Sequence, residues 1–469
     1  MTNHVNMGYV VFLCVVAAIG GILFGYDTAV ISGTTEIVKA QFGLSTGLEG
    51  WCVGCALIGS ILGVVVAGML SDFLGRKKTM LIAALMFSIS AIGCAASANF
   101  TQLVVYRMIG GFGIGVVSIV SPIYISEVAV AEKRGTLVSL YQLAITVGFL
   151  VAYLANYLVL RNADLSLADA SLAERESQGL FTRMWGSEYW RGMLGLETIP
   201  DLLFLLVIFF IPESPRWLIV KGRDSEARSI LQRIYCTPGE TENQMALTRA
   251  SIAGEVKSEW KTLLEPGIRT AVIVGSCIAI LGQFMGVNAV LYYGPKIFQD
   301  AGLSGEGSMF STVLVGVVNM LTTVIALLII DKVGRKQLVW WGVGGMIFCL
   351  LCIGTWFAVG TMPTWFLLTF FLLYVFCTAI SISAVVFVLL SEMYPNRVRG
   401  LAMSVAGLAL WVGTYLIGQL TPWMLENLTP AGTFFLFAFC CLPYLYIMRK
   451  YIPETTGKTL EEIEAYWKK

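Results

Sequence analysis

Apolar runs long enough to cross a membrane recur along the whole chain, and they constrain its fold more than any other feature. A helix needs about 20 apolar residues to cross a bilayer core. The chain is 57% hydrophobic and 13% charged, whereas soluble domains are about 25% charged. We therefore predict an all-α membrane protein with about twelve spanning helices. They are expected over residues 9–33, 50–71, 79–98, 101–126, 136–160, 191–211, 270–297, 309–330, 338–360, 365–392, 400–423 and 432–452.

Three short polar cassettes occur twice, in the same order. They are Asp72-x-x-Gly75-Arg76-Lys77 with Asp331-x-x-Gly334-Arg335-Lys336, Glu127 and Arg134-Gly135 with Glu392 and Arg399-Gly400, and Pro212-Glu213-Ser214 with Pro453-Glu454-Thr455. The members of each pair are 259, 265 and 241 residues apart. A shift of about half the chain indicates two homologous halves, which is a secondary-transporter architecture. We predict six-helix bundles at 1–212 and 270–452, a cytoplasmic linker with short helices at 213–269, and a cytoplasmic tail at 453–469.

The basic residues of the short loops predict the orientation of the chain. They concentrate after the second, fourth, eighth and tenth spans, at Arg76, Lys77, Lys78, Lys133, Arg134, Lys332, Arg335, Lys336, Arg397 and Arg399. The short loops on the other side hold few, such as Lys39 and Lys296. Because basic loops stay in the cytoplasm, both termini are expected there. The first apolar run is too long for a cleavable signal peptide and is expected to be a span.

Side chains that commonly perform catalysis or bind metals are scarce. His4 is the only histidine, which argues against Ser-His-Asp and zinc chemistry. Two C-x-x-C pairs, Cys52/Cys55 and Cys349/Cys352, lie within predicted spans and are expected to be packing residues. We expect no enzyme, no metal and no other cofactor, and the net charge of +1 gives no indication of nucleic acid.

Three ionisable residues stand out inside the apolar spans: Asp27, Arg107 and Glu197. Each costs about 2.5–3.5 kcal/mol at the centre of a membrane helix, so they should face the bundle interior and find partners there. Burial opposes ionisation of a carboxyl group and a nearby arginine favours it, so a carboxylate near Arg107 can load and release a proton. The alternative is a fixed ion pair that only holds helices together. Asp27 is the better candidate for the proton site.

Neutral polar and aromatic side chains also occur where a lipid-facing helix would not need them. They are Gln142, Gln283, Asn288, Asn319, Tyr292 and Trp411. Amides suit vicinal hydroxyl groups and aromatic faces suit the C–H face of a sugar ring, so the set predicts a carbohydrate site near the membrane midplane. Each residue taken alone could equally form a hydrogen bond between helices.

Five stretches of the chain share the pattern of one known family. They are Gly21-Ile-Leu-Phe24-Gly25-Tyr26-Asp27-Thr28-Ala29, Tyr106-Arg107-Met-Ile-Gly110-Gly111, Pro212-Glu213-Ser214-Pro215-Arg216-Trp217-Leu218, Gly286-Val-Asn288-x-x-x-Tyr292-Tyr293 and Pro453-Glu454-Thr455-x-Gly457-Lys458. Together they resemble the sugar porter family of the major facilitator superfamily, and the bacterial xylose:proton symporters in particular. The resemblance covers almost the whole chain.

The resemblance implies a transporter that rocks between inward-open and outward-open states. Asp27 would be the protonation site, paired with Arg107, and Glu197 would be a cytoplasmic relay or latch; facilitative relatives usually carry Asn at the position of Asp27. The implied sugar ligands are Gln142, Gln283, Asn288, Tyr292, Asn319 and Trp411, with Phe24 lining the pocket. The implied cytoplasmic gate consists of Asp72, Gly75, Arg76, Glu127, Arg134, Glu213, Arg216, Asp331, Gly334, Arg335, Glu392 and Arg399.

The chain departs from the family pattern in its predicted pocket. Gly282-Gln283 stands where members often have Gln-Gln, and Ser383-Ala384-Val-Val-Phe387 stands where they have Gly-Pro-x-x-Trp. Ile382 replaces a Trp, and Leu410 and Phe149 stand where the xylose symporters carry Gln. A site discriminates strongly between hydroxylated ligands only when its polar groups are matched. The sequence therefore leaves the identity of the sugar open.

The function predicted from the sequence is proton-coupled uptake of a monosaccharide, a pentose or hexose, by a multi-pass membrane protein that works as a monomer. A bacterial inner membrane is the expected location. A facilitative sugar uniporter and a transporter of polyols or other small neutral solutes remain alternatives. A sugar sensor is a remote one, because such a receptor would need a long cytoplasmic tail.

Overall fold

The fold is described from a computed structural model, which describes residues 5–164, 178–253, 260–395, 398–452 and Trp467. Within these residues the regular secondary structure is helical, and twelve helical segments are long and apolar enough to cross a membrane. This confirms the predicted all-α membrane fold. The segments are Met7–Gly33, Thr46–Leu74, Arg76–Ala96, Phe100–Val128, Ala131–Asn162, Trp190–Phe210, Ile268–Asp300, Gly305–Ile330, Arg335–Val359, Thr364–Met393, Arg399–Asn427 and Thr429–Lys450.

The chain forms two compact units. Unit 1 comprises Met1–Thr28, Ile58–Ala152 and Arg191–Lys257, and unit 2 comprises Ala29–Leu57, Tyr153–Trp190 and Ser258–Lys469. Unit 2 therefore includes two segments from the first half of the sequence as well as the second half.

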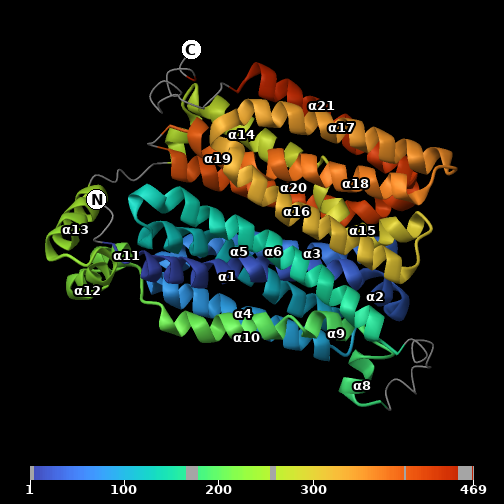
Figure 1. Cartoon of the computed structure of the whole chain (residues 1–469), viewed down its shortest axis with the longest axis horizontal. Coiled ribbons are helices and arrows are strands. Elements are labelled where there is room, and N and C mark those ends of the chain that lie inside the picture. The colour runs from blue at the N-terminus through green and yellow to red at the C-terminus, as the bar shows by residue number, and fades with distance from the viewer. Residues whose placement is uncertain (1–4, 165–177, 254–259, 396–397, 453–466, 468–469) are drawn as a thin grey trace. The chain divides into compact units, whose positions relative to one another are not determined.

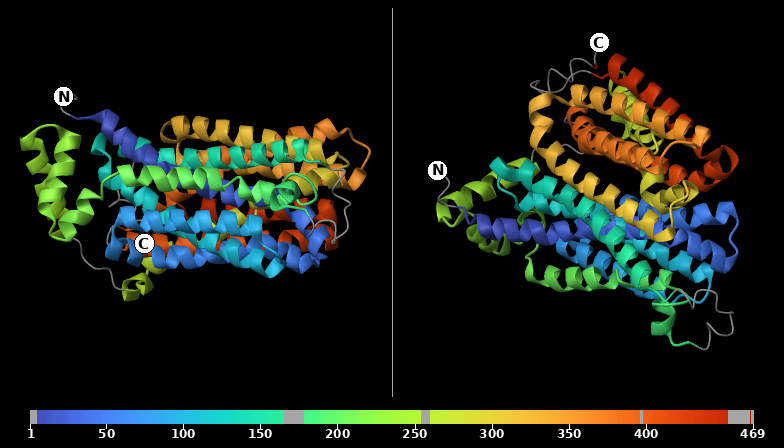
Figure 2. Two further views of the ribbon diagram at one scale, coloured as in Figure 1. Left: turned by 90° about the horizontal axis from the view of Figure 1, so that it is seen from below. Right: turned by 45° about the vertical axis from the view of Figure 1, so that its right-hand side comes forward.

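The helices of unit 1 lie alongside one another, as Figures 1 and 2 show. α4 packs along α5, and α10 lies against α4. The long helices of unit 1 are α1 (Met7–Val30), α3 (Thr46–Leu74), α4 (Arg76–Ala96), α5 (Phe100–Val128), α6 (Arg134–Asn162) and α10 (Thr198–Val207). Three of them, α1, α3 and α6, continue into unit 2.

Glycines let the helices of unit 1 approach closely. A Cβ atom at Gly25 would lie 2.0 Å from the main-chain oxygen of Ile145, and one at Gly148 would lie 2.2 Å from that of Ile22. α1 and α6 therefore cross with their backbones nearly in contact at this pair. Such close approach between small residues is a common way to associate membrane helices.

Unit 2 contains the corresponding bundle from the second half of the chain. α17 packs against α18 and α21, and α14 packs against α20. Its long helices are α14 (Ile268–Gln283), α15 (Val287–Asp300), α16 (Gly305–Val333), α17 (Arg335–Val359), α18 (Thr364–Thr378), α19 (Ala384–Met393), α20 (Arg399–Asn427) and α21 (Thr429–Lys450). A short helix, α2 (Thr35–Phe42), belongs to the same unit.

Two of the predicted continuous spans are broken. The sixth consists of α9 (Trp190–Gly195) and α10, with Glu197 between them. The seventh consists of α14 and α15, which are separated at Gly286, a residue with φ of +90°. That backbone conformation is accessible to glycine at little cost. Gly286 can therefore separate the two helices within an apolar stretch.

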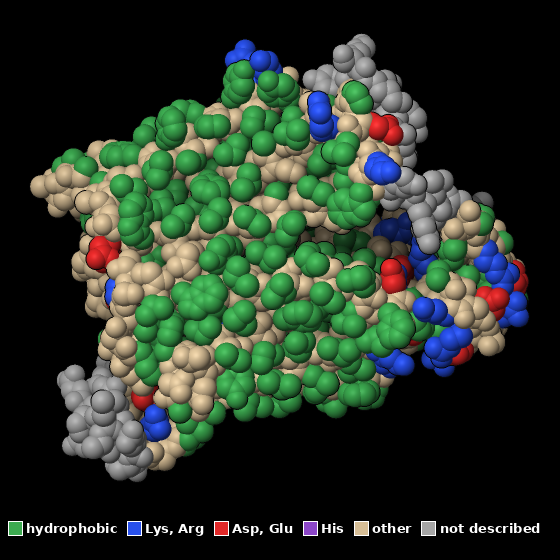
Figure 3. All heavy atoms as spheres, turned by 180° about the vertical axis from the view of Figure 1, so that it is seen from behind, with side chains coloured by type: hydrophobic (Ala, Val, Ile, Leu, Met, Phe, Trp, Pro, Cys, Tyr) green, Lys and Arg blue, Asp and Glu red, His purple; other side chains and the backbone are tan. Residues whose placement is uncertain are grey.

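The linker between the halves is helical in the residues that the structure describes. It contains α11 (Pro215–Val220), α12 (Asp224–Tyr235) and α13 (Pro238–Ala253). Figure 3 shows Lys, Arg, Asp and Glu gathered around these helices, while hydrophobic side chains cover the long helices on the face shown. Exposed side chains such as Phe210, Leu328 and Trp341 are 68–76% accessible, as expected for helices that contact lipid.

Candidate transport site

Asp27 and Arg107 form a buried ion pair inside unit 1. The Nη1 atom of Arg107 donates to Oδ1 of Asp27 at 2.6 Å and to the main-chain oxygen of Asp27 at 3.3 Å. The two side chains are 2% and 3% exposed. The other carboxylate oxygen, Oδ2, has no hydrogen-bond partner among the described residues. One oxygen of Asp27 is thus occupied by the arginine, and the other is available for a proton.

Gly110 makes room for this carboxyl group. It lies on α5, one helical turn from Arg107. A Cβ atom at position 110 would lie 2.4 Å from Oγ of Ser90 and 2.8 Å from Oδ2 of Asp27. Any larger residue would therefore push against the oxygen of Asp27 that has no partner. The glycine three residues after Arg107 in the sequence thus has a steric explanation, because a side chain at this position would collide with Asp27.

Two more buried acids lie nearby on the sixth span. Glu197 is 4% exposed and interacts electrostatically with Asp27 and Arg107. Asp201 follows it by one helical turn and is fully buried. Sequence reasoning missed Asp201, although the spacing of four residues from Glu197 is a signal that both side chains occupy one helix face.

A neutral polar group forms at the break in the seventh span. Asn288 donates from Nδ2 to Oε1 of Gln283 at 2.6 Å, and the hydroxyl group of Thr414 lies 3.2 Å from the same oxygen. Gln283 ends α14, Asn288 lies in the first turn of α15, and Thr414 comes from α20. The sequence predicted the two amides but not Thr414, whose position three residues after Trp411 places both on one side of α20.

The remaining predicted sugar ligands lie on separate helices. In unit 2, Tyr292 is on α15, Asn319 on α16 and Trp411 on α20, and all three side chains are buried. In unit 1, Phe24 is on α1 and Gln142 on α6, and both are half-buried. Within a unit, the structure thus brings Gln283 and Asn288 together and gives the others positions in the helical interior.

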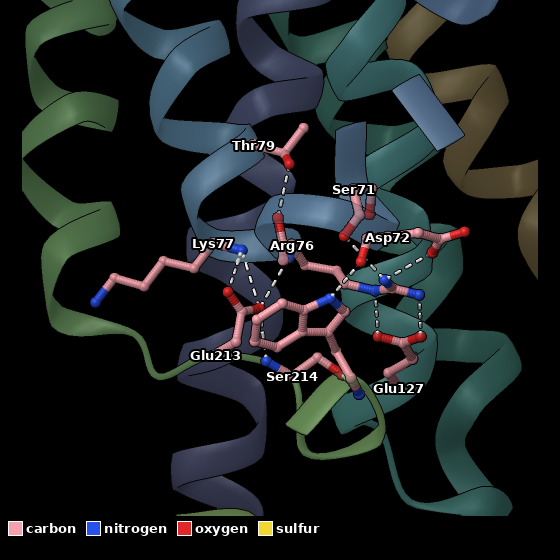
Figure 4. A network of polar contacts seen from close by, with 10 residues as sticks. Ser71, Asp72, Arg76, Lys77, Thr79, Glu127, Glu213 and Ser214 are labelled. Atoms are coloured by element: carbon pink, nitrogen blue, oxygen red, sulfur yellow. Dashed lines mark hydrogen bonds and ion pairs between the residues drawn. The ribbon is translucent and has the colours of Figure 1, made fainter. Parts of the chain in front are cut away.

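The first copy of the charged cassettes forms a compact network, shown in Figure 4. Arg76 binds both carboxylate oxygens of Glu127, each at 2.9 Å, and its Nη1 atom lies 3.1 Å from Oδ1 of Asp72. Gly75, with φ of +96°, ends α3 so that Arg76 begins α4. Parallel hydrogen bonds from a guanidinium group to a carboxylate fix both distance and orientation.

Glu213 connects the linker to this network. Its carboxylate accepts hydrogen bonds from the main-chain nitrogens of Arg76 at 2.8 Å and Lys77 at 3.1 Å, which begin α4. A carboxylate is favourable at a helix N-terminus because the first main-chain N–H groups have no partner in the helix. Trp217 of α11 donates from Nε1 to the main-chain oxygen of Asp72 at 3.0 Å. Arg216 is half-buried on the same helix.

The second copy repeats part of this network within unit 2. Arg335 lies 3.1 Å from Glu392, and Gly334 has the same φ of +96° as Gly75. Arg399 donates to the main-chain oxygen of Tyr394 at 3.3 Å. The side chain of Asp331, and Glu454 with the tail at 453–466, lie outside the described residues. Arg134, also predicted for the gate, is exposed at the start of α6.

A further charged cluster was not predicted from the sequence. Glu49 is fully buried in unit 2 and lies 2.6 Å from the Nζ atoms of both Lys39 and Lys296. Lys296 also lies 3.3 Å from Glu36. The cluster joins α2 and α3, from the first half of the sequence, to α15, from the second half. The signal was the placement of two lysines in otherwise weakly charged loops.

Twelve spanning helices, duplicated charged cassettes and a buried acid–arginine pair define a secondary transporter. The profile of the family described as "Sugar (and other) transporter" matches residues 13–467, and the chain belongs to this family. It is 37% identical to the arabinose-proton symporter of Bacillus subtilis and 35% identical to the D-xylose-proton symporter of Escherichia coli, in each case over 100% of this chain and 97% of the relative.

The fold is also that of solved relatives. The inward-open structure of the xylose transporter XylE from E. coli matches with a TM-score of 0.84 and 35% identity, over 98% of this chain and 100% of that one. The predicted resemblance to the sugar porters of the major facilitator superfamily is confirmed.

Proposed function

We propose that this chain couples proton entry to the uptake of a monosaccharide by alternating access, in the inner membrane of a bacterium and as a monomer. The observation that carries the proposal is the Asp27–Arg107 pair, buried at 2.6 Å with Oδ2 of Asp27 lacking a partner among the described residues. The relatives named as arabinose- and D-xylose-proton symporters support both the proton and the sugar.

The proton would act through the charge of the Asp27 carboxyl group. Burial favours the neutral acid and Arg107 favours the carboxylate, and the balance between them depends on access of water to the site. One proton that enters down about 100 mV supplies roughly 2.3 kcal/mol, and one pH unit adds about 1.4 kcal/mol. That sum supports roughly a 500-fold gradient of a neutral sugar. Glu197 would relay the proton toward the cytoplasm.

The sugar would bind to the amides of Gln283 and Asn288 and to Gln142, Asn319, Tyr292 and Trp411, with Phe24 beside it. Gln283 and Asn288 support this role most directly because they are already in contact through a hydrogen bond of 2.6 Å. Amides bound to each other can exchange that bond for bonds to sugar hydroxyls, since each has both donors and an acceptor. This chemistry fits the hydroxyl groups of pentoses and hexoses.

The functional domains would be the bundles at 1–212 and 270–452, joined by the linker at 213–269 and followed by the tail at 453–469. The cassettes around Arg76 and Arg335 would close the cytoplasmic side, where both termini lie. Asp72, Glu127, Arg134, Glu213, Arg216, Asp331, Glu392 and Arg399 would supply the charges of this gate. Glu49, between Lys39 and Lys296, would close the outer side.

Uptake into proteoliposomes tests the proposal. Labelled D-xylose, L-arabinose, D-glucose and xylitol would be supplied separately, with and without an inward proton gradient. We expect at least one of the monosaccharides to accumulate above equilibrium only when the gradient is present. Uptake that stops at equal concentrations would identify a uniporter, and uptake of xylitol alone would identify a polyol transporter.

A further inference from the structure

Asp201 lies on the inward face of α10, which otherwise carries apolar residues. Asp201, Phe204 and Ile208 are fully buried, whereas Ile199, Leu202 and Leu206 are 49–67% exposed. The ring of Phe204 would contact a Cβ atom at Gly20 of α1 at 3.4 Å. The side chain of Asp201 is therefore directed toward α1 and away from lipid.

Both carboxylate oxygens of Asp201 lack a hydrogen-bond partner among the described residues. A buried carboxylate without a hydrogen-bond partner is very costly, so burial here favours the neutral acid. The titratable and charged groups around this part of the interior come from four helices. They are Tyr26 and Asp27 of α1, Cys94 of α4, Arg107 of α5, and Glu197 beside α10.

The charges of this group do not balance unless protons are bound. Asp27, Glu197 and Asp201 supply three carboxyl groups, and Arg107 supplies the positive charge that acts on Asp27 and Glu197. The ion pair of 2.6 Å uses the charge of Arg107 for Asp27. Glu197 and Asp201, one helical turn apart, then both carry a proton if the interior is to remain neutral.

We propose that Asp201 is a second proton-binding residue of the transport cycle, so that two protons move with each sugar. The inference rests on the proposed proton-coupled function and extends it. When water reaches the site, ionisation of Asp201 becomes less costly, and the group loses its proton.

A proton fits this position better than a metal ion does. In the described parts of the chain, no three His, Cys, Asp or Glu side chains are spaced to bind a metal. Asp27 is moreover held by Arg107 at 2.6 Å, which leaves the cluster without the convergent oxygens that a cation requires. Replacing the proton gradient by a sodium gradient should therefore drive no uptake.

The sugar ratio at which net flux stops, here called the balance point, measures the number of protons transported with each sugar. Proteoliposomes at zero membrane potential, with a difference of one pH unit, would be loaded with the sugar of the panel that wild type transports fastest. Net flux stops at a sugar ratio of about tenfold for one proton and about 100-fold for two. We expect about 100-fold in wild type and about tenfold in Asp201→Asn. Asp224→Asn, on the exposed helix α12, is the matched control and should stay at about 100-fold.

The outcomes separate this inference from the proposed function. A wild-type balance point that ignores the pH gradient contradicts proton coupling itself. A wild-type ratio of about tenfold leaves the symporter intact and overturns the second proton, as does a ratio of about 100-fold in both wild type and Asp201→Asn. Counterflow exchange, which needs no net proton movement, reports whether the variant is folded. If Asp201→Asn fails that check, Asp201→Ala is measured in its place, and a ratio of about 100-fold in that variant overturns the inference in the same way.

Discussion

Among the residues of the candidate transport site, the two units bury different kinds of polar group on similar helical scaffolds. Unit 1 places charges in its interior, with Asp27 and Arg107 at 2.6 Å and Glu197 nearby. Unit 2 places neutral groups at the break of its seventh span, where Asn288 binds Gln283. Protonation changes the charge of a carboxyl group but leaves an amide unaffected. In the proposed function, unit 1 would provide the energetic coupling, and unit 2 would supply most of the groups that recognise the solute.

The duplicated charged cassettes, by contrast, share several contacts between the same atoms. Arg76 donates from Nη1 to the main-chain oxygen of Ser71, and Arg335 donates from Nη1 to that of Ile330, both at 3.2 Å and both five residues earlier. Lys77 and its counterpart Lys336 each donate from Nζ to a main-chain oxygen near the end of the last helix in their half. The duplication is therefore preserved in the charged cassettes and has diverged in the interior.

The largest expected effect comes from removing the charge of Asp27. Asp27→Asn keeps the shape of the side chain but cannot change its protonation, so the proton that Asp27 carries should no longer contribute to uptake. At a difference of one pH unit, the accumulation ratio in proteoliposomes should fall at least about tenfold, while exchange of labelled for unlabelled sugar continues. An unchanged accumulation ratio in this variant would show that the coupling site lies elsewhere.

A smaller but still large effect is expected from Gly110→Ala. The added methyl group would overlap Ser90 and Oδ2 of Asp27, and overpacking of this kind typically costs about 1–3 kcal/mol. The initial rate of uptake should fall by about 30-fold, which corresponds to about 2 kcal/mol. Gly68→Ala is the control, because nothing lies within 4 Å of its Cβ position, and it should transport like wild type. Equal uptake rates in Gly110→Ala and Gly68→Ala would show that a methyl group at position 110 does not disturb Asp27.

Changes in the amide group of unit 2 should alter affinity without altering coupling. Gln283→Ala removes an amide and leaves Asn288 without this partner, which typically costs about 1–3 kcal/mol. We expect the sugar concentration for half-maximal uptake to rise about tenfold, with an unchanged proton-to-sugar ratio. Thr414→Val keeps the shape and should raise it only a few-fold. A changed proton-to-sugar ratio in Gln283→Ala would contradict the proposed separation of coupling from sugar binding.

The smallest expected effect is a difference in stability between variants of the two charged cassettes. Arg76→Ala removes the two hydrogen bonds to Glu127, whose side chain is 8% exposed, whereas Arg335→Ala removes a contact of 3.1 Å to Glu392, whose side chain is 25% exposed. The loss of stability should be larger for Arg76→Ala by about 1 kcal/mol. Asp72 should contribute little, because its side chain is 77% exposed. Thermal unfolding in detergent measures the difference, and equal midpoints would contradict it.

The sequence predicted the spanning helices because apolar length is a strong and local signal. It did not predict the breaks in the sixth and seventh spans. The apolar run continues through Gly286, and only the φ of +90° shows that the helix ends there. The sequence likewise did not predict that Gly75 separates α3 from α4, which begins at Arg76.

The site was predicted in its residues more than in its contacts. Asp27, Arg107 and Glu197 were selected because ionisable side chains are rare in apolar helices. Asp201 was overlooked although it belongs to the same span, because its complete burial and its lack of hydrogen-bond partners among the described residues become evident only in the structure. Thr414 gave no signal of its own, since a threonine in a membrane helix normally bonds to its own backbone, as it also does here to Leu410.

The hydrogen bond between Gln283 and Asn288 spans the break between α14 and α15. Rotation of α15 about Gly286 must lengthen this bond, because each amide is fixed to a different helix. A solute that bonds to both amides resists the same rotation. The angle of α15 and the occupancy of the sugar site are thus linked quantities. By thermodynamic reciprocity, the factor by which bound sugar changes the bending equilibrium equals the factor by which bending changes the affinity for sugar.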